Sequence, residues 1–278
     1  MEKAASAEGK TLSEVIQETA ERYLNHRGID RLLYLWRYNT DGTLCPPGDT
    51  SPVPPPYLLL PPDGKFPALI EWNGRQYEHL RMGIFIARDA TDWDVADLFD
   101  RLSPEWDGHT NLKFNRAVYR ALAVKAVRHR GAAPVAKVLD FVSGTGLGFS
   151  VFRKLFPRAN LCAFDLSPKM ASRSKRKGYC MKSLSNNRLR IPDHDIDLVA
   201  GAFVLGLLRA DFWIHELSRI LAPGGVASFN LFNPPAGWEA RFSKLFSGAG
   251  IPLCHDALST FSGGGKEGKM HLLIARKQ

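Results

Sequence analysis

Residues 134–149, PVAKVLDFVSGTGLGF, combine a short apolar run with a glycine-rich turn. The apolar run ends in Asp140, and glycines follow at positions 144, 146 and 148. A short apolar run bounded by turn residues predicts a strand that is buried on both faces. Glycine lets the backbone turn tightly and approach a ligand where a Cβ would intrude. Because residues 147–156 have the apolar spacing of a helix, the stretch predicts the beginning of a nucleotide-binding βαβ unit.

A second predicted strand, residues 159–164, ends in Asp165, which is 19 positions after Gly146. An acid at about this distance can accept hydrogen bonds from both hydroxyls of a ribose. The glycines alone also fit a purely structural turn, and Asp165 also fits the cap of a helix that begins Asp-Leu-Ser-Pro. The two roles of Asp165 are compatible, and its pairing with the glycines favours a ligand site.

Size and composition narrow the class of protein. The chain has 278 residues, of which 45% are hydrophobic, so it can bury a sizeable core. No apolar run approaches the ~18–20 residues of a membrane span, and the N-terminus is polar, unlike a signal peptide. The four cysteines are far apart and form no C-x-x-C pair, which argues against zinc and against disulfides. We therefore expect a cytoplasmic protein without a metal site.

Charge is distributed unevenly along the chain. Residues 1–100 hold 10 Lys/Arg and 16 Asp/Glu, a net charge of −6, whereas residues 101–278 hold 27 and 12, a net charge of +15. This asymmetry fits two regions that face each other, an anionic substrate, or nucleic acid. Nucleic acid is the least favoured of the three, because the acidic N-terminal region would repel phosphate.

The first hundred residues predict an α+β extension. Residues 11–26 have the spacing of an amphipathic helix, and the Pro-rich stretch 41–64 predicts loop or extended chain. Asn73-Gly74 between the apolar runs 68–72 and 76–87 indicates a β-hairpin. A helical pattern starts at Thr91.

The remainder of the chain predicts an α/β domain. A helix over 112–130 precedes alternating strands and helices from 135 to 232, with a tight turn at 223–225. Strands at 252–261 and 270–276 follow, and the short connection between them suits an antiparallel pair. The expected fold is a doubly wound, mostly parallel seven-stranded sheet with a reversed last strand, in a domain of residues 97–278 after an extension of residues 1–96.

These segments resemble, in order and spacing, the class I, Rossmann-like S-adenosylmethionine-dependent methyltransferases, and among them the quinone and small-molecule methyltransferases. Residues 138–146 are similar to the family's glycine motif, and residues 164–170 are similar to its acidic strand end. Residues 189–199 and 216–225 resemble the segments around its fourth and fifth strands, and residues 99–107 resemble its FD-x-x-x-x-x-YD segment. The resemblance covers roughly residues 97–278.

The resemblance implies S-adenosylmethionine as cofactor. Asp165 would hold the ribose, Leu166 and Ser185 would flank the adenine, and Arg116 would pair with the cofactor carboxylate. The residues that the resemblance assigns to the cofactor site are Asp140, Val142, Gly144, Thr145, Gly146, Asp165, Leu166, Ser185, Ala202, Phe203 and Arg116. Two positions depart from the family pattern: Val142 stands where the family has glycine, and Ser185 stands where it often has an acid.

The implied function is methyl transfer to a small organic acceptor, with residues 1–96 forming part of the acceptor pocket or a homodimer contact. The candidate catalytic bases are His79, His109 and His194, each of which also fits a structural histidine. Two alternatives remain open. One is an enzyme of the same fold that catalyses a non-methylating step such as cyclisation, suggested by Val142. The other is an RNA methyltransferase or a non-catalytic binding subunit, suggested by the net charge of +15.

Overall fold

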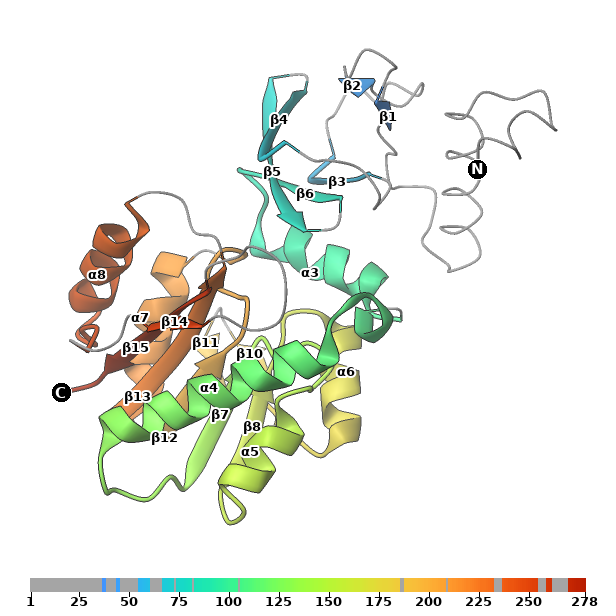
Figure 1. Ribbon diagram of the computed structural model, residues 1–278. Helices are drawn as coiled ribbons and strands as arrows, with labels where there is room; N and C mark the ends of the chain where they lie inside the picture. The colour runs from blue at the N-terminus through green and yellow to red at the C-terminus, as the bar shows by residue number, and fades with distance from the viewer. Residues whose placement is uncertain are drawn as a thin grey trace. The chain divides into compact units, whose positions relative to one another are not determined.

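The computed structural model describes residues 37–38, 44–45, 55–60, 67–72, 74–81, 83–104, 106–185, 188–208, 210–232, 237–254, 259–261 and 270–278. The chain divides into two compact units, Met1–Pro104 and Glu105–Gln278 (Figure 1). Helix α3 (Asp92–Leu102) belongs to the first unit. It runs across positions 96 and 97, which are the domain boundary expected from the sequence. The helix expected over 11–26 lies outside the described residues.

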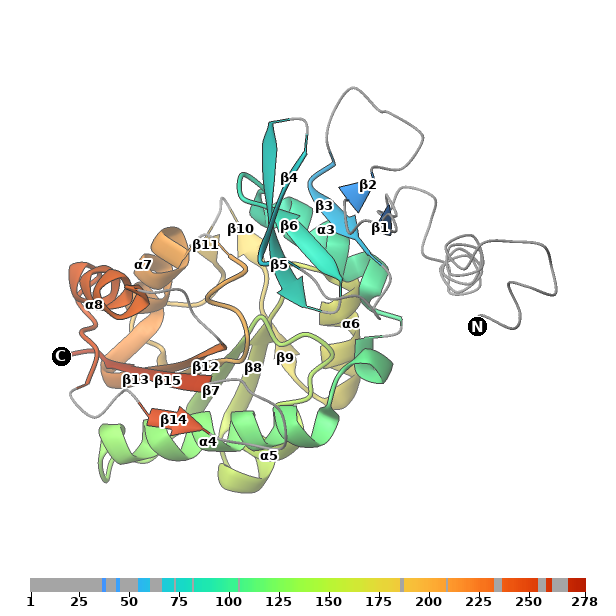
Figure 2. The ribbon, with the colours of Figure 1, turned by 45° about the horizontal axis from the view of Figure 1, so that its top comes forward.

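The first unit contains a four-stranded antiparallel sheet in the order β3-β6-β5-β4 (Figure 2). The expected hairpin is confirmed, since Trp72 pairs with Arg75 across the turn at Gly74. The single strand expected over 76–87 is wrong, because Gly83 has a φ of 76° and divides it in two. The strands of this unit are β1 (Arg37–Tyr38), β2 (Leu44–Cys45), β3 (Tyr57–Leu59), β4 (Leu69–Trp72), β5 (Arg75–Arg81) and β6 (Ile84–Ala87).

The second unit contains a seven-stranded sheet in the order β14-β15-β13-β12-β7-β8-β9. Strands β7, β8, β9, β12 and β13 are parallel, and β15 is antiparallel to both of its neighbours, which confirms the predicted doubly wound fold with a reversed last strand. The strands are β7 (Lys137–Phe141), β8 (Asn160–Phe164), β9 (Cys180–Met181), β12 (Ile196–Gly201), β13 (Leu221–Phe232), β14 (Ser259–Phe261) and β15 (Met270–Arg276). A small hairpin, β10 (Leu184–Ser185) and β11 (Arg188–Leu189), follows β9.

Helices cover both faces of this sheet. Figure 2 shows α4 and α5 on one face and α7 and α8 on the other. Helix α4 buries Val118, Leu122 and Ala126, one apolar stripe at the spacing that the sequence predicts. The helices and the single 3₁₀ turn among the described residues of this unit are η1 (Trp106–His109), α4 (Leu112–Arg130), α5 (Phe149–Leu155), α6 (Pro168–Lys177), α7 (Ala210–Ile220) and α8 (Trp238–Gly248).

Two expected segments differ in detail from the structure. The glycine turn at 223–225 lies within β13, where the register with β12 shifts between Ile196 and Leu198. Of the strand expected over 252–261, only 259–261 form a strand among the described residues, and Leu253 forms an isolated bridge with Ala275.

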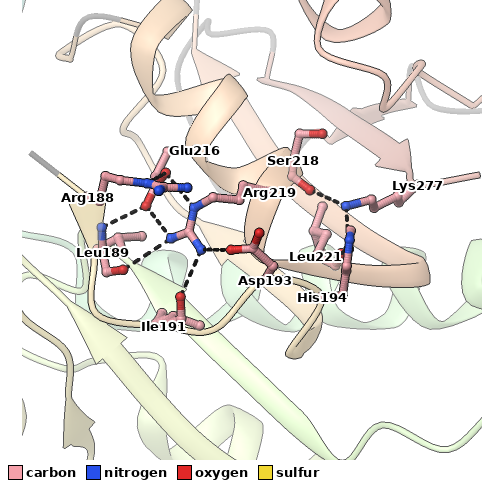
Figure 3. Close-up of polar contacts among 10 residues, drawn as sticks. All are labelled: Arg188, Leu189, Ile191, Asp193, His194, Glu216, Ser218, Arg219, Leu221 and Lys277. Atoms are coloured by element: carbon pink, nitrogen blue, oxygen red, sulfur yellow. Dashed lines mark hydrogen bonds and ion pairs between the residues drawn. The ribbon is translucent and has the colours of Figure 1, made fainter.

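Arg219 of α7 fixes the segment that leads into β12 (Figure 3). Its guanidinium donates to the backbone carbonyls of Leu189 and Ile191 at 3.1 and 2.9 Å, and to the carboxylates of Glu216 and Asp193. Glu216, which is buried, also accepts from the backbone N–H of Leu189 at 2.7 Å. The carboxylates raise the pKa of Arg219 above its ordinary value. Arg219 therefore supplies hydrogen-bond donors to residues 189–193, a segment that has little regular structure.

We expect Arg219→Ala to lower the free energy of unfolding by about 2 kcal/mol, because the buried carboxylate of Glu216 loses the guanidinium that balances its charge. Arg188→Ala is the control, since Arg188 lies 3.9 Å from the same carboxylate and its side chain is 62% exposed. That variant should change stability by less than about 0.5 kcal/mol. Urea denaturation measures both changes, and equal losses would contradict the role given to Arg219.

Candidate functional site

The turns after three parallel strands meet at one edge of the second unit's sheet. Phe141, the last residue of β7, pairs with Phe164, the last residue of β8, and Ala200 near the end of β12 pairs with Asp140. The chain leaving these strands at 142–146, 165–166 and 202–203 therefore emerges at the same carboxyl edge. Ligands of open parallel sheets bind in this position.

Asp165 is hydrogen-bonded directly to the glycine turn. Its carboxylate accepts from the backbone N–H of Gly144 at 2.7 Å and from that of Ser167 at 3.0 Å, so it orients the turn. The cap of α6 is Ser167, whose hydroxyl accepts from the N–H of Met170 at 3.1 Å, and not Asp165. The Asp165 side chain is only partly buried. Gly144 has a φ of 54°, and among the described residues, apart from Gly144 and its two chain neighbours, no atom lies within 4 Å of the position that a Cβ would take. A partly buried carboxylate beside open space at a glycine fits the ribose and the adjoining chain of a nucleoside ligand.

Val142 has a φ of 57°, in the left-handed region that a β-branched residue rarely adopts. This is the position at which the sequence departs from the glycine pattern. The backbone at Val142 therefore keeps a conformation that glycine favours. The turn does not change to suit the valine, so the backbone is strained at this residue.

We expect Val142→Gly to raise the free energy of unfolding by about 1 kcal/mol, because relief of left-handed strain exceeds the entropy gained by the unfolded chain. Binding of S-adenosylmethionine should tighten about tenfold, equivalent to about 1.4 kcal/mol. Val142→Ala is the matched control, because it keeps a Cβ in the same conformation. Urea denaturation and calorimetric titration provide the two measurements, and identical behaviour of the two variants would contradict this account.

Asp140 lies in the core next to the glycine turn. Its side chain is fully buried, Oδ2 accepts from the hydroxyl of Tyr179 at 2.6 Å, and the carboxyl group also interacts with the side chain of Tyr119. Oδ1 has no hydrogen-bond partner among the described residues. Burial raises the pKa of Asp140 to about 7. A Cβ on Gly148 would lie 2.6 Å from Oδ2, so the third glycine makes room for this carboxyl.

The turn after β12 is held by a buried amide. Phe203 has a φ of 63°, and its backbone N–H donates to Oδ1 of Asn230 on β13 at 2.8 Å. Asn230 is 1% exposed, and its Nδ2 has no acceptor among the residues that the structure describes. The predicted site residues Ala202 and Phe203 are therefore fixed at the carboxyl edge by a residue that the sequence interpretation did not include.

The other predicted cofactor residues lie on several elements. Leu166 is buried beside Asp165, and Thr145 and Gly146 are buried within the glycine turn. Ser185 is half-buried in the β10–β11 hairpin that follows β9. Arg116 is an exposed residue in the first half of α4.

The candidate histidines occupy three different places. His79 is in β5 of the first unit, with its ring 4.9 Å from that of Phe85, and burial lowers its pKa. His194 precedes β12 and lies at the amino edge of the sheet, where Lys277 donates to its Nδ1 at 2.9 Å (Figure 3). His109 ends η1, close in sequence to Asp107, which contacts the glycine turn. Of the three, the structure separates His194 from the carboxyl-edge site.

Comparison with known proteins agrees with this geometry. Residues 139–229 match a family model described as a methyltransferase domain. The chain is 28% identical over 140 residues to the ubiquinone/menaquinone biosynthesis C-methyltransferase UbiE of Syntrophotalea carbinolica, covering 48% of this chain and 58% of that protein. It is also 28% identical over 168 residues to the malonyl-[acyl-carrier protein] O-methyltransferase of Laribacter hongkongensis, covering 55% and 54% respectively. The chain thus spans little more than half the length of these relatives.

A solved structure shows the same fold. The [4+2]-cyclase SpnF superposes with a TM-score of 0.54 at 14% identity, covering 67% of this chain and 97% of that one. In the described part of the chain, helices are too short or too polar to cross a membrane.

Proposed function

We propose that this protein, whose second unit is a class I, Rossmann-like S-adenosylmethionine-dependent methyltransferase domain, transfers a methyl group to a small organic acceptor. The observation that carries the proposal is the partly buried carboxylate of Asp165, which accepts from the N–H of Gly144 beside open space. The family match over residues 139–229 includes both residues. S-adenosylmethionine is the cofactor of this family.

The residues present fit that cofactor by position and chemistry. Asp165 would accept from the ribose hydroxyls, Leu166 and Ser185 would flank the adenine, and the backbone at Gly144 and Ala202 would line the methionine part. When bound, the cofactor supplies an electrophilic methyl group on a sulfonium with a good leaving group. The work left to this chain is to align the acceptor and exclude water. A base is needed only for an acceptor that is protonated at the working pH.

Two considerations support a small acceptor with an apolar or aromatic body. Tryptophan and tyrosine are frequent in residues 1–100, which suits a pocket for such a molecule. One of the two relatives at 28% identity is named for ubiquinone/menaquinone biosynthesis, which agrees with such an acceptor, and the other is named for malonyl-[acyl-carrier protein]. Quinols and carboxylic acids are therefore both included in the test.

The test is calorimetric titration with S-adenosylmethionine and with its demethylated product, followed by incubation with a methyl-labelled cofactor. Quinols, phenols and short-chain carboxylic acids are supplied as acceptors. We expect micromolar binding of both cofactor forms and transfer of the label to one acceptor class. Absence of binding would overturn the proposal and favour a non-catalytic subunit.

A second candidate is a non-methylating reaction such as cyclisation, which Val142 favours because a side chain there crowds the methionine end of the cofactor. In that case the substrate would be consumed while the label stays on the cofactor. The other expectations remain proposals: a cytoplasmic location, a homodimer, and no role for nucleic acid or membrane. Light scattering tests the dimer, and the salt dependence of RNA binding tests the nucleic-acid alternative.

A further inference from the structure

Asp107 connects the segment at the start of the second unit to the glycine turn. Its Oδ1 accepts from the hydroxyl of Thr145 at 2.5 Å, and its Oδ2 accepts from the guanidinium of Arg173 on α6 at 2.7 Å. Both oxygens of one carboxylate are thus used, one by the turn and one by the helix that follows Asp165. The Asp107 and Arg173 side chains are only 30% and 24% exposed, so solvent weakens this pair less than a surface ion pair.

The glycine turn also has direct contacts with α6. The hydroxyls of Ser143 and Ser174 lie 2.7 Å apart, and Ser174 donates to the carbonyl of Gly144 at 3.2 Å. A Cβ on Gly146 would lie 2.9 Å from Cα of Ser174, so the glycine lets the helix approach this closely. The glycine turn and α6 therefore pack directly against each other. Asp107 of η1 is bonded to both of them.

Thr145 is the residue between two glycines with positive φ, 54° at Gly144 and 78° at Gly146. Glycines give a turn many accessible conformations, so a side-chain contact between them selects one. The hydroxyl of Thr145 is the only side-chain polar group in residues 144–146. Its hydrogen bond to Asp107 fixes the side-chain rotamer of Thr145. The backbone facing the cofactor is then fixed with it.

We propose that Asp107 is a positioning residue for the cofactor site: through Thr145 and Arg173 it holds the glycine turn in its binding conformation. This inference rests on the proposed function. Asp107 stands only three positions after Pro104, the last residue of the first unit, so the same contact ties the chain that leaves that unit to the cofactor turn. Breaking the contact loosens residues 106–110 and the glycine turn together, and the cofactor then dissociates faster.

The experiment uses the full chain and three variants, Asp107→Ala, Thr145→Val and the double variant. We expect each single variant to raise the dissociation constant and the dissociation rate of S-adenosylmethionine about 5- to 10-fold, equivalent to about 1–1.4 kcal/mol. The double variant should be no weaker than Asp107→Ala alone, because both changes remove the same hydrogen bond. Asp211→Asn, an exposed acid of α7, is the matched control and should bind as the wild type does.

Hydrogen exchange of the amides at 142–146, measured without ligand, gives a readout that is independent of the cofactor. Faster exchange there in Asp107→Ala and Thr145→Val supports the proposal. Unchanged exchange and affinity together with a lower free energy of unfolding would overturn it, and so would additive losses in the double variant. If the wild type fails to bind S-adenosylmethionine, the proposed function fails, while the exchange data still decide whether Asp107 holds the turn.

Discussion

Asp165→Ala should weaken binding of S-adenosylmethionine by at least about 100-fold. The variant removes a charged acceptor from two ribose hydroxyls, and hydrogen bonds to charged groups contribute about 1.5–3 kcal/mol each. It also leaves the N–H of Gly144, now bonded to the carboxylate at 2.7 Å, without its acceptor. Calorimetric titration of the wild type and the variant measures the change.

Asp165→Asn separates the two contributions. The amide keeps an oxygen for the Gly144 N–H but loses the negative charge, so we expect a smaller loss of about tenfold. Glu239→Ala, an exposed acid at the start of α8, should leave affinity unchanged. Wild-type affinity in Asp165→Ala, with the fold intact by circular dichroism, would place the cofactor elsewhere.

Replacement of Asp140 by asparagine should change how stability depends on pH. The pKa of this fully buried carboxyl is raised to about 7 by burial, against 3.8 for an exposed aspartate. The folded protein keeps the proton between these values while the unfolded chain loses it. The free energy of unfolding therefore falls as pH rises from about 4 to about 7, by about 4 kcal/mol for this group.

Asp140→Asn does not titrate, so its stability relative to the wild type should increase over this range and be highest above pH 7. Urea denaturation of both proteins at pH 5 and pH 8 measures the difference, in which contributions from other titrating groups cancel. Tyr179→Phe provides a second comparison, since the tyrosine hydroxyl that it removes lowers the pKa of Asp140. A constant difference between wild type and Asp140→Asn at the two pH values would contradict the raised pKa.

Local patterns predicted most of the second unit. Helix α4 has the expected bounds of 112–130, and strand β8 begins one residue after the expected start at 159 and ends at 164 as expected. Each is specified by its own apolar spacing. The strand expected over 76–87 failed at Gly83, whose positive φ depends on the turn geometry rather than on the apolar pattern.

The candidate site was predicted less completely, because residues that are hydrogen-bonded to each other in it are far apart in sequence. Asp107 and Thr145 are 38 positions apart, and Asn230 holds Phe203 from 27 positions away. Nothing in the local sequence indicates such pairs. The position of His194 could have been predicted, since a loop that precedes a parallel strand lies at the amino edge, opposite the site.

Within the part of the chain that the structure describes, the two outermost strands of the large sheet are very short, with two residues in β9 and three in β14. Such short edge strands present few unpaired N–H and C=O groups to which another polypeptide could add a strand. Self-association by continuing the sheet from one copy into the next is therefore disfavoured. Any homodimer should be sought on helical or loop surfaces, where cross-linking and interface substitutions can be directed.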